Sequence, residues 1–280
     1  MKPLKADLLL LFVTVCWGSS YLFMKVGLDS VSEFNLIALR FGLAFLFASA
    51  IFYRRFMKID RATVKFAALL GFILFIIFTL VTFGLKTTTT SNAGFLISLT
   101  VIFVPLISTV VYRNKPETKL RISILLAIIG IALLTIQLPF RIQFGDLLCI
   151  AAAFCYAIHI LVAGSAAHKV DTLNLGILQL GFAGFFGFVF SLLLETPTFP
   201  DSTISWIAIL ALSILCSGVG FILQIVAQQY TTPVRTGLIF SLEPVFAAIV
   251  GVVFAHEVIT GAGYIGASLM LFGVILSSIK

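Results

Sequence analysis

Apolar residues dominate ten segments of the chain, and short polar connections separate these segments. Each segment has roughly the 20 residues that a helix needs to cross the hydrocarbon core of a bilayer. The predicted membrane-spanning helices cover residues 7–27, 34–53, 64–84, 92–111, 120–138, 146–165, 174–194, 204–228, 236–255 and 260–279. Because the connections are too short to form a separate soluble domain, the pattern predicts an all-α membrane protein with ten transmembrane helices. Its functional residues must lie in or beside these helices.

The composition excludes a soluble protein. Hydrophobic residues make up 61% of the 280 residues, charged residues make up only 10%, and the mean hydropathy is +1.19. A soluble domain has an apolar share of about 45 to 50%. The cysteines lie inside apolar segments without paired or metal-type spacing, so we expect no metal and no cofactor.

The charge pattern predicts an orientation in the membrane. The net charge is +7, but the basic residues lie in short connections between apolar segments, so we expect no nucleic-acid partner. If the N-terminus is cytoplasmic, 14 of the 18 Lys and Arg residues fall on the cytoplasmic side. No small-residue cleavage site follows the first segment, so this segment is expected to be retained. We predict a multi-pass protein of the cytoplasmic membrane with both termini in the cytoplasm.

The two halves of the chain resemble each other at ordered positions. At one constant offset in numbering, Cys16-Trp17 matches Cys155-Tyr156, and Leu39-Arg40-Phe41-Gly42 matches Leu178-Gln179-Leu180-Gly181. At a second, slightly larger offset, Thr88-Thr89 matches Thr231-Thr232, Gly94 matches Gly237, Ser98-Leu99 matches Ser241-Leu242, and Gly130 matches Gly273. Five helices per unit is an odd number, so the second unit must enter the membrane from the opposite side. The sequence therefore predicts two inverted five-helix repeats, residues 1–138 and 139–280.

The ninth segment holds an acid and a proline, Glu243 and Pro244, inside an apolar run. A charge at bilayer depth costs about 2.5 to 3.5 kcal/mol on insertion scales, so an intramembrane acid suggests a functional site. Pro244 cannot donate to the carbonyl of Phe240, which adds polarity beside the acid. Glu243 either lines a solute pathway or fixes helix packing. Arg40, in the second segment, either attracts a carboxylate or ties its helix to an outer-loop acid such as Glu33.

Together these features resemble a known family. The ten segments in two units, the early Cys16-Trp17-Gly18, Arg40-Phe41 in the second segment and Ser241-Leu242-Glu243-Pro244-Val245-Phe246 in the ninth are similar to the EamA family of the drug/metabolite transporter superfamily. This resemblance covers essentially the whole chain. It implies a secondary carrier, commonly an exporter of amino acids or other small metabolites. It also implies a central cavity lined by the first, third, fourth, sixth, eighth and ninth helices.

Aromatic and titratable residues share faces of the first and sixth segments. Trp17 and Tyr21 lie on one side of the first, and Tyr156 and His159 lie on one side of the sixth. We expect these residues to contact the substrate, with aromatic rings around an apolar or cationic portion of it. Ordinary packing is the alternative. Near the middle of the membrane, His159 and Glu243 are candidates for carrying protons, whereas a neutral histidine bonded to a neighbouring helix is the alternative for His159.

A polar stripe along the eighth segment supplies further candidates for substrate binding. Ser217, Gln224 and Gln228 recur at helical spacing, and Asn92 and Ser98 add polar groups from the fourth segment. Uncharged amides and hydroxyls suit hydrogen bonding to a polar solute. Hydrogen bonds between helices, worth about 0.6 kcal/mol each, are the structural alternative.

These observations predict a secondary active transporter that exports amino acids or similar small polar metabolites by alternating access, coupled to protons or to exchange. Its expected partners are the metabolite, the lipid bilayer and protons, and the expected assembly is a monomer or a homodimer. A channel or a nontransporting scaffold is the alternative. An intramembrane enzyme is less favoured, because no Gly-x-Ser-x-Gly motif and no His/Cys/carboxylate group with ligand spacing occurs, so we expect no catalytic residues.

Overall fold

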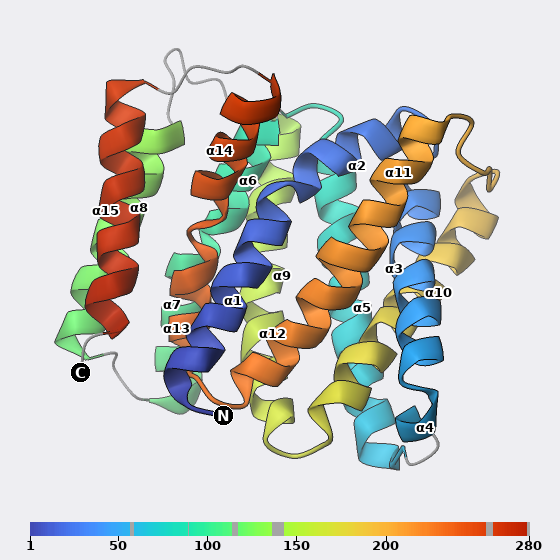
Figure 1. The fold of residues 1–280 in the computed structure, drawn as a ribbon, viewed down its shortest axis with the longest axis horizontal. Coiled ribbons are helices and arrows are strands. Elements are labelled where there is room, and N and C mark those ends of the chain that lie inside the picture. Colours follow the sequence, from blue (N-terminus) through green and yellow to red (C-terminus); the bar gives the residue numbers. More distant parts are fainter. Residues whose placement is uncertain (57–58, 89, 114–116, 136–142, 256–259, 279–280) are drawn as a thin grey trace.

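A computed structural model describes the chain except residues 57–58, 89, 114–116, 136–142, 256–259 and 279–280. The described part is all-helical (Figure 1). Its helices are α1 (Pro3–Gly18), α2 (Ser20–Leu28), α3 (Glu33–Ile51), α4 (Tyr53–Phe56), α5 (Arg61–Gly84), α6 (Thr90–Ser98), α7 (Thr100–Tyr112), α8 (Thr118–Thr135), α9 (Phe144–Ala167), α10 (Thr172–Leu194), α11 (Thr203–Ala211), the π-helix η1 (Leu212–Val219), α12 (Gly220–Gln228), α13 (Pro233–Phe240), α14 (Glu243–Ala255) and α15 (Gly261–Ser278).

Within the described residues, eight helical stretches are long and apolar enough to cross a membrane, and α15 is a shorter apolar helix. Four predicted spans consist of more than one helix: α1 with α2, α6 with α7, α11 with η1 and α12, and α13 with α14. The helices α8 and α15 occupy the fifth and tenth predicted spans, whose last residues lie outside the described part of the chain. The first helix begins and the last ends at the same end of the bundle (Figure 1). We call this end the terminal end and the opposite end the far end.

The two units pack through each other. The first helix of the first unit, α1, packs on α12, α13 and α14 of the second unit. The first helix of the second unit, α9, packs correspondingly on α5, α6 and α7 of the first unit. The second helices, α3 and α10, pack against each other, and so do the fifth helices, α8 and α15, which stand at one side of the bundle (Figure 1). The core between the units therefore contains equivalent helices from both.

Two glycines that match between the repeats allow α8 and α15 to approach closely. A Cβ atom on Gly130 of α8 would lie 2.5 Å from the carbonyl oxygen of Gly266 in α15. A Cβ atom on Gly273 of α15 would lie 2.9 Å from the carbonyl oxygen of Ser123 in α8. Since lipid provides no hydrophobic drive for helix association, such close contact through small residues is a main source of stability in a membrane.

The fourth helix of each unit is broken at the same place in the repeat. One break separates α6, which ends at Ser98, from α7, which begins at Thr100. The other separates α13, which ends at Phe240, from α14, which begins at Glu243. Thr100 and Glu243 occupy equivalent positions, related by the same offset as Ser98 and Ser241. Pro244 lies in the first turn of α14, where its missing N–H costs no helical hydrogen bond.

Candidate functional site

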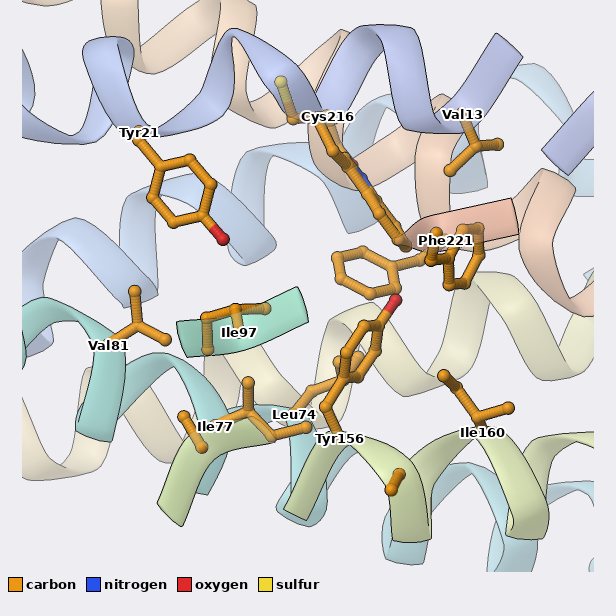
Figure 2. Close-up of a cluster of buried hydrophobic side chains, with 14 of the residues drawn as sticks. Val13, Tyr21, Leu74, Ile77, Val81, Ile97, Tyr156, Ile160, Cys216 and Phe221 are labelled. Atoms are coloured by element: carbon orange, nitrogen blue, oxygen red, sulfur yellow. The ribbon is translucent and has the colours of Figure 1, made fainter. Parts of the chain in front are cut away.

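Both units contribute to a small cavity in the core, which has a volume of about 40 Å³. That volume holds a few water molecules at most. The lining combines aromatic, aliphatic, polar and charged side chains: Trp17, Ser20, Tyr21, Met24, Arg40, Ile77, Phe78, Val81, Ile97, Tyr156, Phe221 and Glu243. Figure 2 shows Tyr21 and Tyr156 reaching from opposite helices with their hydroxyl groups directed towards the middle of this cluster.

Glu243 is placed at the cavity by the break in the ninth span. It is the first residue of α14, and only 5% of it is exposed. The N-terminus of a helix favours a negative charge, because its first N–H groups point outwards without helical partners. The hydroxyl group of Tyr21 lines the same cavity and interacts with the Glu243 carboxyl group. An ionisable group thus faces the cavity close to a hydroxyl group of the first span.

Arg40 is the second charged residue of the cavity, and only 2% of it is exposed. Its Nε donates a 2.6 Å hydrogen bond to the Ser217 hydroxyl group, and its Nη1 lies 3.2 Å from the sulfur of Met24. Its guanidinium carbon lies 4.2 Å from the centre of the Phe78 ring, a favourable cation–π arrangement. These contacts hold the guanidinium in place but do not neutralise its charge.

No carboxylate in the described residues lies within ion-pairing distance of Arg40. The ion pairs shorter than 4.0 Å in that part of the chain join Lys86 to Glu33 and Arg235 to Asp7. Glu33 is therefore not the partner of Arg40, contrary to one of the alternatives drawn from the sequence. Arg40 and Glu243 instead interact electrostatically across the cavity without direct contact.

The aromatic wall of the cavity is fixed by Trp17. Its indole Nε1 donates a 2.7 Å hydrogen bond to the carbonyl oxygen of Cys216, inside the π-helix η1. The ring centre of Trp17 lies 5.9 Å from Tyr156, 4.9 Å from Phe221 and 4.8 Å from Phe240. Trp17 and Tyr156, which match in the repeat, thus meet edge to face at the interface between the two units.

His159 lies behind this wall and does not line the cavity. It is fully buried, and its Nε2 is 3.1 Å from Oε1 of Gln179 on α10. Its ring packs on Tyr156, with 5.8 Å between the ring centres. This geometry is that of a histidine bonded to a neighbouring helix, and contact with a solute in the cavity would require Tyr156 to move.

The amides of the eighth span are not among the residues that line the cavity. Gln228 Nε2 donates to the carbonyl oxygen of Ile160 at 3.1 Å, and Gln224 lies between Gln228 and the Tyr156 hydroxyl group, at 3.4 and 3.5 Å. These contacts join α12 to α9 across the interface between the units. Ser217 reaches the site indirectly, through its bond to Arg40.

The two candidates from the fourth span lie elsewhere. Ser98 donates to the carbonyl oxygen of Gly94 within its own helix. Asn92 lies at the far end and approaches the Asp146 carboxylate at 3.4 Å. Of the residues expected to bind substrate, the structure therefore brings Trp17, Tyr21, Tyr156 and Glu243 together at the cavity.

Phe221 is a cavity residue that the sequence did not select for the site, and Arg40 is one for which the sequence left a structural role open as the alternative. For Arg40 a signal was present, because a cation within an apolar segment is costly and therefore informative. For Phe221, one of 29 phenylalanines, the sequence offered no signal.

Two interleaved helical units, with broken helices meeting at a buried charged cavity, have the architecture of a membrane transporter. The chain matches the model of the EamA-like transporter family twice, over residues 4–136 and 143–279, and it belongs to that family. The drug/metabolite transporter superfamily includes this family.

Relatives of known sequence agree with this assignment. An uncharacterized transporter from Archaeoglobus fulgidus is 31% identical over 284 residues, covering 100% of this chain and 88% of that protein. The uncharacterized transporter YetK from Bacillus subtilis is 26% identical, covering 94% of this chain and 83% of that protein. A solved crystal structure with 20% identity covers 98% of each chain with a TM-score of 0.82, which shows the fold. These relatives point to transport rather than catalysis.

Proposed function

We propose that the protein is a secondary active transporter that exports small polar metabolites, amino acids among them, by alternating access with proton coupling. The observation that carries the proposal is the pair of buried charges, Arg40 and Glu243, which line the same closed cavity without contacting each other. A buried charge without a partner is costly, so a solute that satisfies both charges gains binding energy from each.

The chemistry of the two groups favours a solute with a carboxylate and an amine. The planar guanidinium of Arg40 suits a carboxylate, which it can bind through two parallel hydrogen bonds. Glu243 and the hydroxyl group of Tyr21 offer oxygen atoms to an ammonium group. The rings of Trp17 and Tyr156 add favourable contact with a cation or an apolar side chain. Growth of the cavity beyond its present size would accompany binding.

Proton coupling follows from competition at one carboxyl group. Glu243 can hold a proton or an ammonium group, but it cannot bind both in the same way. A carrier that releases the solute on one side of the membrane and the proton on the other side therefore exchanges solute for protons. His159, bonded to Gln179 behind Tyr156, is the second candidate for a coupling residue.

Reconstitution into proteoliposomes tests the proposal. Counterflow of amino acids is expected, with acceleration by a pH gradient, whereas organic anions that lack an amine and amines that lack a carboxylate should compete weakly. A channel would instead give flux far above carrier rates without counterflow. A nontransporting scaffold would neither form nor dissipate a solute gradient. Either result would refute the proposal.

A further inference from the structure

Two carboxylates occupy equivalent positions in the two units and make equivalent contacts. Asp7 of α1 and Asp146 of α9 are related by the same offset in numbering as Trp17 and Tyr156. At the terminal end, Asp7 pairs with Arg235 at 2.5 Å and interacts with Thr231. At the far end, the Asp146 Oδ1 atom accepts hydrogen bonds from the side chains of Thr88 and Asn92.

The partners of these acids are themselves related by the repeat. Thr88 corresponds to Thr231, and Asn92 to Arg235, at the slightly larger offset that relates the fourth helices. Each contact therefore joins the first helix of one unit to the beginning of the fourth helix of the other. The same latch is built twice, once near each end of the bundle. We call them the terminal latch, Asp7 with Arg235 and Thr231, and the far latch, Asp146 with Thr88 and Asn92.

Each latch contributes residues to the lining of an open hollow at its end of the bundle. Thr231 and Arg235 line a hollow of about 960 Å³ at the terminal end. Thr88 lines a hollow of about 230 Å³ at the far end, together with the ion pair of Lys86 and Glu33. The central cavity lies between these hollows and measures about 40 Å³. Both latches are closed in this structure, in keeping with the small size of the cavity.

We propose that the terminal and far latches are the two gates of the transport pathway, and that their unequal chemistry sets the side to which the carrier opens at rest. This inference rests on the proposed alternating-access function. Access to the cavity from one end requires α1 to separate from α13, or α9 to separate from α6, and the corresponding latch opposes that movement. An inverted repeat supplies such equivalent gates at opposite faces.

The two gates differ at one related pair of positions. Arg235 makes the terminal latch a charged pair, whereas Asn92 gives the far latch an amide at the same place. The terminal latch adds the attraction between two opposite charges, which the uncharged amide of Asn92 cannot supply to the Asp146 carboxylate, so the far gate opens more readily. The substrate-free carrier is therefore expected to open mainly towards the far end. A ligand then shifts this preference only as far as it binds one state better than the other.

Exchange of the two related residues provides the test. A cysteine at Ser20, which lines the central cavity, reports access when an impermeant thiol reagent is added to either side of proteoliposomes with known orientation. The native cysteines are replaced first. The reference protein should label mainly from the far end. The double variant Asn92→Arg with Arg235→Asn keeps the same net charge but should label mainly from the terminal end. The ratio of far-end to terminal-end labelling should fall by about tenfold.

Single variants and a matched control sharpen the test. Arg235→Asn alone should raise labelling from the terminal end, and Asp146→Asn should raise labelling from the far end. Lys169→Asn removes a charge from the terminal hollow and changes no latch residue, so its ratio of far-end to terminal-end labelling should match that of the reference protein. If the double variant is poorly folded, the single variants supply the opposing shifts.

The proposal is overturned if the folded variants retain the reference ratio, or if Lys169→Asn shifts the ratio as far as Arg235→Asn. Labelling needs neither substrate nor a proton gradient. Unchanged labelling with normal counterflow would thus refute the gates alone. Shifted labelling without counterflow of any solute would refute the proposed substrate and leave the gates in place.

Discussion

The indole nitrogen of Trp17 donates a 2.7 Å hydrogen bond to the carbonyl oxygen of Cys216, 199 residues away in the other unit. Cys216 lies in η1, where π-helical geometry interrupts the regular ladder of backbone hydrogen bonds. Trp17 thus satisfies a backbone acceptor in the core and presents its ring to the cavity. One side chain thereby ties the third helix of the second unit to the first helix of the first unit.

Replacement of Trp17 by phenylalanine should destabilise the protein by about 1 to 3 kcal/mol, because it leaves the Cys216 carbonyl oxygen without this donor. Thermal unfolding in detergent measures the effect. Trp206→Phe is the matched control, since Trp206 stacks on the exposed Phe199. Equal melting temperatures for the two variants would show that the Trp17 bond contributes nothing.

Replacement of Gln228 by leucine should lower stability by about 0.6 kcal/mol, the typical value of an interhelical hydrogen bond in a membrane. The KM for the transported solute should stay unchanged, because Gln228 bonds the Ile160 carbonyl oxygen and does not line the cavity. Melting temperature and counterflow measured on the same sample separate the two effects. A raised KM at unchanged stability would return Gln228 to the substrate site.

Replacement of Arg40 by glutamine should raise the KM for a carboxylate-bearing solute by about 10- to 100-fold, the loss of a charge-assisted bond worth about 1.5 to 3 kcal/mol. Arg40→Lys should recover only part of the affinity, because an ammonium lacks the planar fork. Arg54→Gln, on an exposed residue of α4, is the control. The KM for a related amine without a carboxylate should not change. If both kinds of solute lose affinity equally, Arg40 has only a structural role.

Replacement of Glu243 by glutamine keeps the shape and hydrogen-bonding capacity of the side chain but removes its ability to ionise. Exchange of solute down its gradient should persist, while the acceleration by a pH gradient should disappear. Glu117→Gln, in the terminal hollow, should retain full acceleration. If the Glu243→Gln variant still concentrates solute at the unmodified rate, the coupling acid lies elsewhere, and His159 is the next residue to replace.

We predict from the asymmetry of basic residues between the two ends that the terminal end is cytoplasmic. A cysteine in place of Lys119 at the terminal end should be shielded from an impermeant label in intact cells, and one in place of Asp201 should react. Permeabilised cells provide the control, because both positions should then react. Labelling of the Lys119 position alone in intact cells would reverse the predicted topology.

The positions of the helices and the division of the chain into two repeats could be predicted from the sequence. The span predicted at 146–165 is α9, Phe144–Ala167, and the span predicted at 34–53 is α3, Glu33–Ile51. Such boundaries are local, since they depend on the length of an apolar run relative to the thickness of the bilayer. Glu243 was likewise recognisable as a candidate site residue, because the cost of a charge in lipid is a property of that residue.

Which polar residues face the cavity depends on the packing of the helices and could not be read from the sequence. Helical periodicity places Gln224 and Gln228 on one face, but only the packing of α12 against α9 turns that face towards the Ile160 carbonyl oxygen rather than a solute. Ser217 holds Arg40 from a position 177 residues away in the chain. Asn92 likewise meets Asp146 because the first helix of each unit packs against the fourth helix of the other. The sequence pattern along one helix does not reveal which helix packs beside it. That neighbouring helix decides whether a polar side chain makes a packing contact or faces the cavity.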